Sequence, residues 1–182
     1  MKSYRWAGLA GFALLWSAAS LAATPPSEPA ARQEAEKLAQ LPPVTPHGGI
    51  DHSGRKQKGR ASYYAHHFTN RKMADGNRFD PNSNVAASKS LPLGTTAKVT
   101  NLKSGKSALV KVQDRGPFID GRVVDVTPKV ADQLDMNKAG VTPVEVAPIA
   151  VPQADGAVKL GAGAPDANPQ EVEQAMRAAG PR

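Results

Sequence analysis

The sequence predicts a mainly β fold, a small barrel with one or two short helices, between two low-complexity tails. Between about residues 58 and 150, short segments of alternating apolar and polar residues are separated by Gly and Pro. On both sides of this block the chain is rich in Pro, Ala and Gly. Such segments bury too little apolar surface to offset the entropy lost on ordering. We therefore expect one folded domain, since a block of about 90 residues is large enough for a single core.

Residues 1–23 have the features of a secretory signal peptide. Lys2 and Arg5 precede an apolar run over 6–21, and small residues at Ser20 and Ala22 suit a cleavage site. An uncleaved anchor is the alternative, although the run is short for a span of about 20 apolar residues. The chain contains no Cys, so it has neither a disulfide nor a lipobox cysteine. We expect a soluble, monomeric protein in the periplasm or secreted medium.

The expected barrel begins after a Pro-rich linker over residues 24–57. A short strand is predicted at 60–64. The alternation over 96–102 and 107–114, with a Gly-containing turn between them, predicts a β-hairpin.

The second half of the block adds two further strands and a helix. Another strand is predicted at 122–126, and Thr127 and Pro128 supply an N-cap and a first-turn proline for a helix ending near Leu134. The strand at 141–149 contains two Pro residues and is expected at an edge or bulge. Residues 151–182 read as a mostly disordered tail, with a short helix at 169–179.

The basic surplus of the chain lies in the middle block. The net charge is +7, and residues 55–150 contain 16 Lys and Arg against 8 Asp and Glu. A basic surface favours polyanionic partners such as cell-wall polymer or lipid headgroups, and secretion argues against nucleic acid. A general contribution to solubility is the alternative explanation of this charge.

Asp114 is the strongest candidate for chemistry. It ends the predicted strand 107–114, in register with Val112 and Val110, and is followed by Arg115 and then Gly116. A carboxyl at the end of a barrel-facing row would be partly desolvated, which raises its pKa and suits a general acid for a glycosidic oxygen. The alternative is a turn-forming Asp that accepts hydrogen bonds from backbone amides.

The polar loop over 70–80 is the second candidate region. Its side chains can form a sugar-binding wall, although an ordinary exposed loop is the alternative. One ring of the pair Tyr63 and Tyr64 is expected to face solvent, where it could stack on a sugar, unless both rings pack in the domain. Calcium-loop and zinc spacings are not satisfied, so we expect neither a metal nor another cofactor.

Several motifs occur together in the order found in one protein family. They are Gly59–Ala65, Asn70–Asp80, Ala86-Ala87, Leu91-Pro92-Leu93, Val99–Leu102, Asp114–Phe118 and Gly121–Asp125. Over about residues 58–150 the sequence resembles the rare lipoprotein A (RlpA)-type peptidoglycan lytic transglycosylases. The resemblance implies a six-stranded double-psi β-barrel that cleaves peptide-poor glycan strands. It also matches Asp80 and Asp114 to carboxylates that family members keep.

The chain departs from the family pattern at three positions. Asn77 stands where the family usually has Glu, Ser88 where it has His, and Met73 where it has Thr. The resemblance then implies Asp114 as acid and base, with Asp80 orienting or polarising the substrate. The residues expected to hold sugar are Asn77, Ser88, Arg115, Arg71 and one or both of Tyr63 and Tyr64.

Three functions remain open at this point. A lytic transglycosylase uses no water, because the C6 hydroxyl of muramic acid attacks its own anomeric carbon, so one carboxyl can serve as acid and then base. The resemblance therefore favours endolytic cleavage of MurNAc–GlcNAc bonds, giving 1,6-anhydro-MurNAc ends. The first alternative is a non-catalytic, expansin-like peptidoglycan-binding module. The second is a protein-binding partner or inhibitor that uses the barrel as a scaffold.

Overall fold

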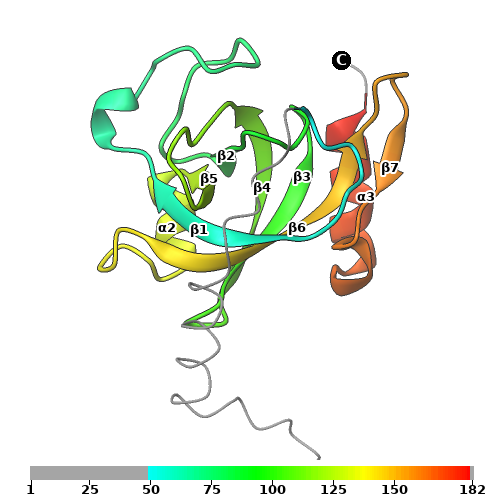
Figure 1. The fold of residues 1–182 in the computed structure, drawn as a ribbon. Coiled ribbons are helices and arrows are strands. Elements are labelled where there is room, and N and C mark those ends of the chain that lie inside the picture. Colours follow the sequence, from blue (N-terminus) through cyan, green and yellow to red (C-terminus); the bar gives the residue numbers. More distant parts are fainter. Residues whose placement is uncertain (1–48, 181–182) are drawn as a thin grey trace, which may run out of the picture.

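The computed structural model describes residues 49–180, which form a closed barrel of six strands (Figure 1). Around the barrel the strands follow the order β1-β5-β2-β4-β3-β6, and pairing of β1 with β6 closes the ring. The pairs β1–β5 and β2–β4 are parallel and the others are antiparallel. The strands are β1 Gln57–Tyr63, β2 Val85–Ala87, β3 Thr96–Asn101, β4 Ser107–Asp114, β5 Arg122–Val126 and β6 Thr142–Pro152. This arrangement confirms the mainly β, six-stranded barrel.

Two strands differ from the sequence prediction in extent and one was not predicted. β1 begins at Gln57, within the predicted linker, because its first residues pair with β6. β6 runs from Thr142 to Pro152 and tolerates both of its internal prolines. The three-residue strand β2 has no readable alternation, and its position depends on pairing with β4 and β5, which are distant in sequence.

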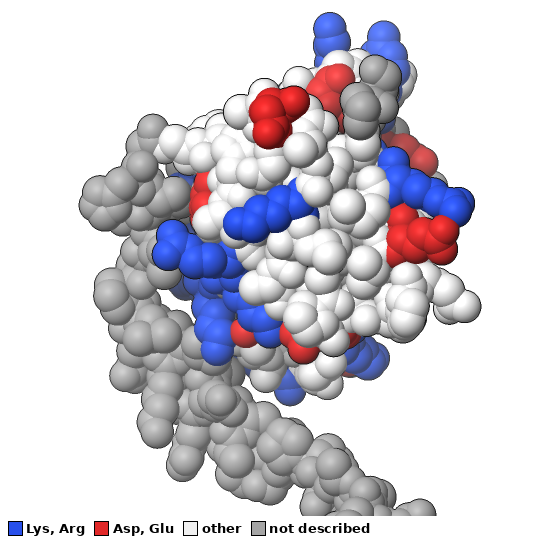
Figure 2. All heavy atoms as spheres, turned by 90° about the vertical axis from the view of Figure 1, so that its right-hand side faces the viewer, with Lys and Arg blue, Asp and Glu red and all other residues white. Residues whose placement is uncertain are grey.

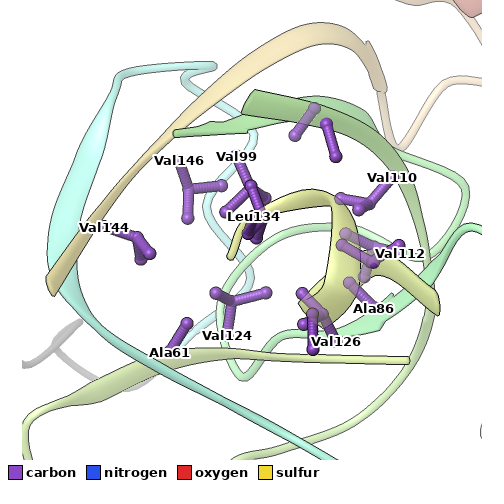
Figure 3. Packing of buried hydrophobic residues seen from close by; sticks show 14 of the residues in the cluster. Ala61, Ala86, Val99, Val110, Val112, Val124, Val126, Leu134, Val144 and Val146 are labelled. Atoms are coloured by element: carbon purple, nitrogen blue, oxygen red, sulfur yellow. The ribbon is translucent and has the colours of Figure 1, made fainter. Parts of the chain in front are cut away.

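Small aliphatic side chains fill the barrel. Figure 3 shows the valines of β3, β4, β5 and β6 pointing inward around Leu134, which is fully buried. Leu134 directly follows helix α2, Pro128–Gln133, whose N-cap Thr127 accepts a hydrogen bond from the Val130 N–H as the sequence predicts. Since each buried Val or Leu contributes about 1.5–3 kcal/mol, this cluster is the main source of stability of the barrel.

The segment after the barrel is folded through Gly180, which corrects the extent of the predicted tail. It forms strand β7, Val158–Leu160, the 3₁₀-helix η2, Ala164–Asp166, and helix α3, Pro169–Ala179, at the predicted helix bounds. The small residues that suggested disorder are what allow close packing. A Cβ atom on Gly161 would lie 2.3 Å from the carbonyl oxygen of Pro148. The last two residues lie outside the described range.

Helix α3 packs against the outside of β6 and forms a second small core (Figure 1). Ala175 and Ala179 face Ile149 and Ala150 of β6. Asn168 and Glu171 form a reciprocal capping box at the start of the helix. In the view onto this side, charged side chains lie mostly around a largely uncharged centre (Figure 2). The basic surplus therefore does not cover this face.

A third apolar cluster lies under the long connection from β1 to β2, which includes the 3₁₀-helix η1, His66–Phe68. Buried Met73, Phe79 and Val85 pack with partly buried Tyr64 and Phe68. The cluster anchors the loop over 70–80, which is part of this connection, next to β2 and so positions the candidate site. Within residues 49–180, none of the helices is long and apolar enough to cross a membrane. The predicted signal peptide lies outside the described residues.

Candidate functional site

The site is built where β4 ends beside the short strand β2. Ala86 pairs with Val112, but Ala87 pairs with Asp114, so two residues of β4 lie opposite one residue of β2. Asp114 thereby leaves the row of Val110 and Val112 that fills the barrel. The alternation of apolar and polar residues along 107–114 predicted that the Asp114 carboxylate would face the barrel interior. The irregularity instead brings the Asp114 carboxylate into contact with the β1–β2 connection.

Three donors hold the half-buried carboxylate of Asp114. The hydroxyl of Tyr64 donates to Oδ2 at 2.8 Å. The backbone N–H groups of Ala74 and Arg115 both donate to Oδ1 at 2.9 Å. The carboxylate therefore ties the 70–80 loop to the end of β4. Since a carboxylate has about four acceptor positions, the group is oriented but retains capacity for a ligand proton.

Tyr64 orients Asp114 from within the third apolar cluster. Its ring centroid lies 4.5 Å from that of Phe79 and 5.5 Å from that of Phe68. Burial raises the pKa of Tyr64 well above its usual range, and the hydrogen bond to Asp114 and the charges of Asp114 and Asp125 act in the same direction. The phenol is therefore a neutral, permanent donor. The other member of the pair, Tyr63, is half-buried against the barrel core, with its hydroxyl 3.4 Å from the Asn137 carbonyl oxygen.

The structure places Asn77 next to the end of β4. Its exposed side chain donates from Nδ2 to Asp75 Oδ2 at 2.7 Å, and Gln113 Nε2 donates to the same oxygen at 2.7 Å. The backbone N–H of Asp75 also donates to the Gln113 carbonyl oxygen at 3.0 Å. Asn77 is thus within two hydrogen bonds of the residue preceding Asp114. Asp75 lies in the predicted polar loop over 70–80, and its acidic side chain two residues before Asn77 was a usable signal in the sequence.

Asp80 and Arg71 lie on the same connection but make local contacts. Asp80 is exposed, and its Oδ1 accepts a hydrogen bond from the Asn82 N–H at 2.9 Å, which stabilises the turn after it. Among the described residues, no hydrogen bond or ion pair joins Asp80 to Asp114. Arg71 is exposed and its guanidinium carbon lies 5.3 Å from the centroid of Phe68, a cation–π contact.

Ser88 and Arg115 stabilise the backbone that follows β2. Ser88 is 1% exposed, and its hydroxyl oxygen accepts a hydrogen bond from the Leu91 N–H. Arg115 donates from Nη1 to the carbonyl oxygens of Ser88 and Leu91 at 3.1 and 2.6 Å. Burial lowers the pKa of Arg115, and the nearby charge of Asp114 opposes this shift. Both side chains hold the backbone between Ser88 and Leu91 in place beside Asp114. The sequence did not indicate this positioning role.

Asp125 is a carboxylate two strands from Asp114, since it pairs with Ala87 of β2 and Ala87 pairs with Asp114. It was not among the predicted site residues. It lies on β5, accepts from the Ser62 hydroxyl at 2.7 Å and forms a 2.6 Å ion pair with Arg122. In sequence it reads as an ordinary outward-facing polar residue of an alternating strand. Across the described residues, no cluster of three or more acidic or His side chains is arranged to hold a metal ion.

The loop after Asp114 presents apolar side chains to solvent. Phe118 is 81% exposed and Ile119 is 54% exposed. The loop begins directly after Asp114, so the exposed ring of Phe118 follows the Asp114 carboxylate by four residues in the chain. Aromatic faces of this kind can stack on apolar or sugar ligands.

A six-stranded barrel with two parallel strand pairs, carrying an oriented carboxylate where a parallel strand ends, defines an RlpA-like double-psi β-barrel protein. Residues 56–146 match the family described as lytic transglycolase, and the chain belongs to this family.

The similar proteins share only the barrel region with this chain. Over 89 residues it is 45% identical to the probable endolytic peptidoglycan transglycosylase RlpA of Treponema pallidum, covering 49% of this chain and 28% of that protein. Over 93 residues it is 39% identical to the endolytic peptidoglycan transglycosylase RlpA of Campylobacter jejuni, covering 51% of this chain and 34% of that protein. The chain therefore spans about a third or less of these two relatives.

Among solved structures, a Streptomyces papain inhibitor is 22% identical, with a TM-score of 0.41 over 52% of this chain and 94% of that one.

Proposed function

We propose that this protein is an extracytoplasmic endolytic peptidoglycan lytic transglycosylase. Its substrate would be peptide-poor glycan strands, cleaved at MurNAc–GlcNAc bonds. The observation that carries the proposal is the Asp114 carboxylate, which Tyr64 and two backbone N–H groups hold in one orientation. The proposal is further supported by the two relatives described above, whose names describe this activity.

The proposed reaction needs only one proton-transferring group. Asp114 in its protonated form donates its proton to the glycosidic oxygen as the bond from that oxygen to the MurNAc anomeric carbon breaks. The C6 hydroxyl of the same MurNAc attacks the anomeric carbon and gives its proton to the Asp114 carboxylate. The products are a 1,6-anhydro-MurNAc end and a free GlcNAc hydroxyl, and no water is consumed. An intramolecular nucleophile of this kind can supply up to about 7–11 kcal/mol through proximity.

The remaining residues of the site act around Asp114 in this scheme. Tyr64 is a positioning residue, and Asn77 offers an exposed amide that can hydrogen-bond a sugar but cannot transfer a proton. Losing an auxiliary acid–base group typically costs about 10²–10⁴ in rate. A weakened but working enzyme is therefore consistent with Asn77. Asp80 stays in the scheme as a polarising residue only if substrate binding brings it to the sugar.

A non-catalytic peptidoglycan-binding module is the second candidate function. The presence of Asn77 where the resemblance implies Glu favours this alternative. A binding module of this kind would contact peptidoglycan through the barrel surface, its basic side chains and the exposed Phe118.

One experiment separates the two candidates. Protein lacking residues 1–23 is incubated with peptide-free glycan strands, and 1,6-anhydro-MurNAc ends are quantified by mass spectrometry. Asp114→Asn should abolish these ends, whereas Asp155→Asn, in an exposed turn beyond β6, should not. Binding is measured in parallel by pelleting with purified cell wall. Pelleting without anhydro ends from the unaltered protein would select the binding module.

A further inference from the structure

We infer that Lys72 and Arg78, on the loop over 70–80, form a binding site for the lactyl carboxylate of MurNAc in peptide-free glycan strands. This inference rests on the proposed function and deepens it, because it names the side chains that would recognise the substrate. In a peptide-bearing strand the stem peptide converts the lactyl carboxylate into an amide, so the negative charge beside the sugar ring is lost. Two cations at this place therefore favour peptide-free strands.

The backbone of the loop fixes these two side chains next to each other. Lys72 and Arg78 are directly paired in an isolated antiparallel β-bridge. The Met73 N–H donates to the Asn77 carbonyl oxygen at 2.8 Å, so the bridge continues toward the tip of the loop. The side chains of Met73 and Phe79 are buried, and successive side chains of extended backbone alternate between faces. Lys72 and Arg78 therefore project from the opposite face of the loop, where both are exposed.

The bridge concentrates positive charge at one point of the surface. Like charges placed directly opposite each other on paired strands are destabilising. Within residues 49–180, neither Lys72 nor Arg78 takes part in an ion pair that would offset this repulsion. The residue before Lys72 is also a cation, Arg71, whose guanidinium carbon lies 5.3 Å from the centroid of the Phe68 ring. A bound anion would relieve the repulsion, so the pair fits an anionic ligand.

Contacts within the loop direct both cationic groups. A Cβ atom added to Gly76 would lie 4.0 Å from Lys72 Cε, so the end of the Lys72 side chain lies beside the turn that precedes Asn77. Arg78 Nη1 donates to the Asn70 carbonyl oxygen at 2.9 Å, a contact that orients the guanidinium. A guanidinium has five N–H groups, and it can bind a carboxylate through two parallel hydrogen bonds. The pair therefore offers an ammonium and an oriented guanidinium to one carboxylate.

The pair is close enough to Asp114 to contact the same sugar. The Ala74 N–H donates to Asp114 Oδ1, and Lys72 precedes Ala74 by two residues, which is about 7 Å of extended backbone. In MurNAc five single bonds of about 1.5 Å join the anomeric carbon to the lactyl carboxyl carbon, so these atoms lie within about 7 Å of each other. A MurNAc whose anomeric carbon is next to Asp114 thus has its lactyl carboxylate within reach of Lys72 and Arg78.

The competing explanation is that the two cations only contribute to solubility. The experiment measures the affinity of the protein for short fluorescent peptide-free strands, either native or with their lactyl carboxylates converted to methylamides. The double variant Lys72→Gln/Arg78→Gln removes both charges of the bridge. Its control is Lys103→Gln/Lys106→Gln, which removes two exposed charges from the β3–β4 turn, at the end of β4 opposite Asp114. Release of anhydro ends is measured as kcat and KM, and melting temperatures are recorded without glycan.

We expect Lys72→Gln/Arg78→Gln to bind native strands about 3–20-fold more weakly at low salt, as loss of two exposed charge pairs does. The unaltered protein should lose at least as much affinity when the strands are methylamidated, and the double variant should lose little more on those strands. On native strands the double variant should raise KM with kcat nearly unchanged. Its melting temperature should not fall, because the substitution removes a repulsion. The control should bind native strands as the unaltered protein does.

Three results would overturn the inference. The double variant could keep its full affinity for native strands. It could instead lose the same affinity for native and methylamidated strands, which would show that the pair does not recognise the carboxylate. The control variant could also weaken binding as much as the double variant, which would indicate general charge attraction. Failure of the proposed function gives a different result. If the unaltered protein releases no anhydro ends but the double variant alone loses affinity for native strands, cleavage is excluded and the carboxylate site stands.

Discussion

Replacing Tyr64 by Phe tests how the site holds its carboxylate. The substitution keeps the ring contacts with Phe68 and Phe79 and removes only the 2.8 Å hydrogen bond to Asp114 Oδ2. A hydrogen bond to a charged group contributes about 1.5–3 kcal/mol, and the half-buried position of Asp114 favours the lower part of this range. A loss of about 1.5–2 kcal/mol should lower the melting temperature by about 5–10 °C.

The same loss sets the expected effect on turnover. If the phenol holds Asp114 in its reactive orientation, about 1.5–2 kcal/mol corresponds to a fall of about 10–30-fold in kcat. KM and pelleting on cell wall should change little, because Tyr64 does not offer a free ring to the sugar.

Tyr63→Phe is the matched control for stability. Its hydroxyl makes only a 3.4 Å contact with a carbonyl oxygen near the surface, so the melting temperature should change by less than in Tyr64→Phe. Melting curves and anhydro-end assays are run on both variants. If Tyr64→Phe keeps the kcat and melting temperature of the unaltered protein, the phenol does not orient Asp114. A rise in KM at constant kcat would instead indicate that Tyr64 binds the sugar.

Three further predictions concern the surroundings of the site and the C-terminal segment. Asn77→Glu should raise kcat by up to about 10²-fold, since it adds an acid–base group beside Asp75 at an exposed position; unchanged product yield would show that this loop does not reach the substrate. Phe118→Ala should weaken pelleting with glycan strands by about 2–10-fold through loss of stacking, while Phe118→Tyr should not; equal binding by both would exclude a stacking role. Gly161→Ala should destabilise the protein by more than about 2 kcal/mol in urea unfolding, because the added carbon meets the Pro148 carbonyl oxygen; a loss below about 1 kcal/mol would contradict the close packing of this segment on β6.

Elements with strong local signals could be predicted from the sequence. β4 and β5 have the predicted bounds because alternation and flanking Gly residues mark their ends. Helix α2 follows the N-cap Thr127 and Pro128, and helix α3 has the predicted range. In each case the residues that set the boundary are neighbours in sequence.

Features that depend on distant partners could not be predicted. The orientation of Asp114 follows from the irregular pairing of β2 with β4, which alternation within β4 does not reveal. The proximity of Asp125 to Asp114 requires the order β5-β2-β4 around the barrel. The folded segment after β6 depends on close contacts of its glycines with β6, whereas its composition alone resembles a disordered tail.

Digestion of peptide-free glycan strands in ¹⁸O-labelled water tests the central claim most directly. If Asp114 is the proton-transferring group and the C6 hydroxyl is the nucleophile, the new MurNAc ends carry the 1,6-anhydro bridge and contain no ¹⁸O. Asp114→Asn should then release no new ends. Reducing ends labelled with ¹⁸O, or anhydro ends released equally by Asp114→Asn, would contradict the account.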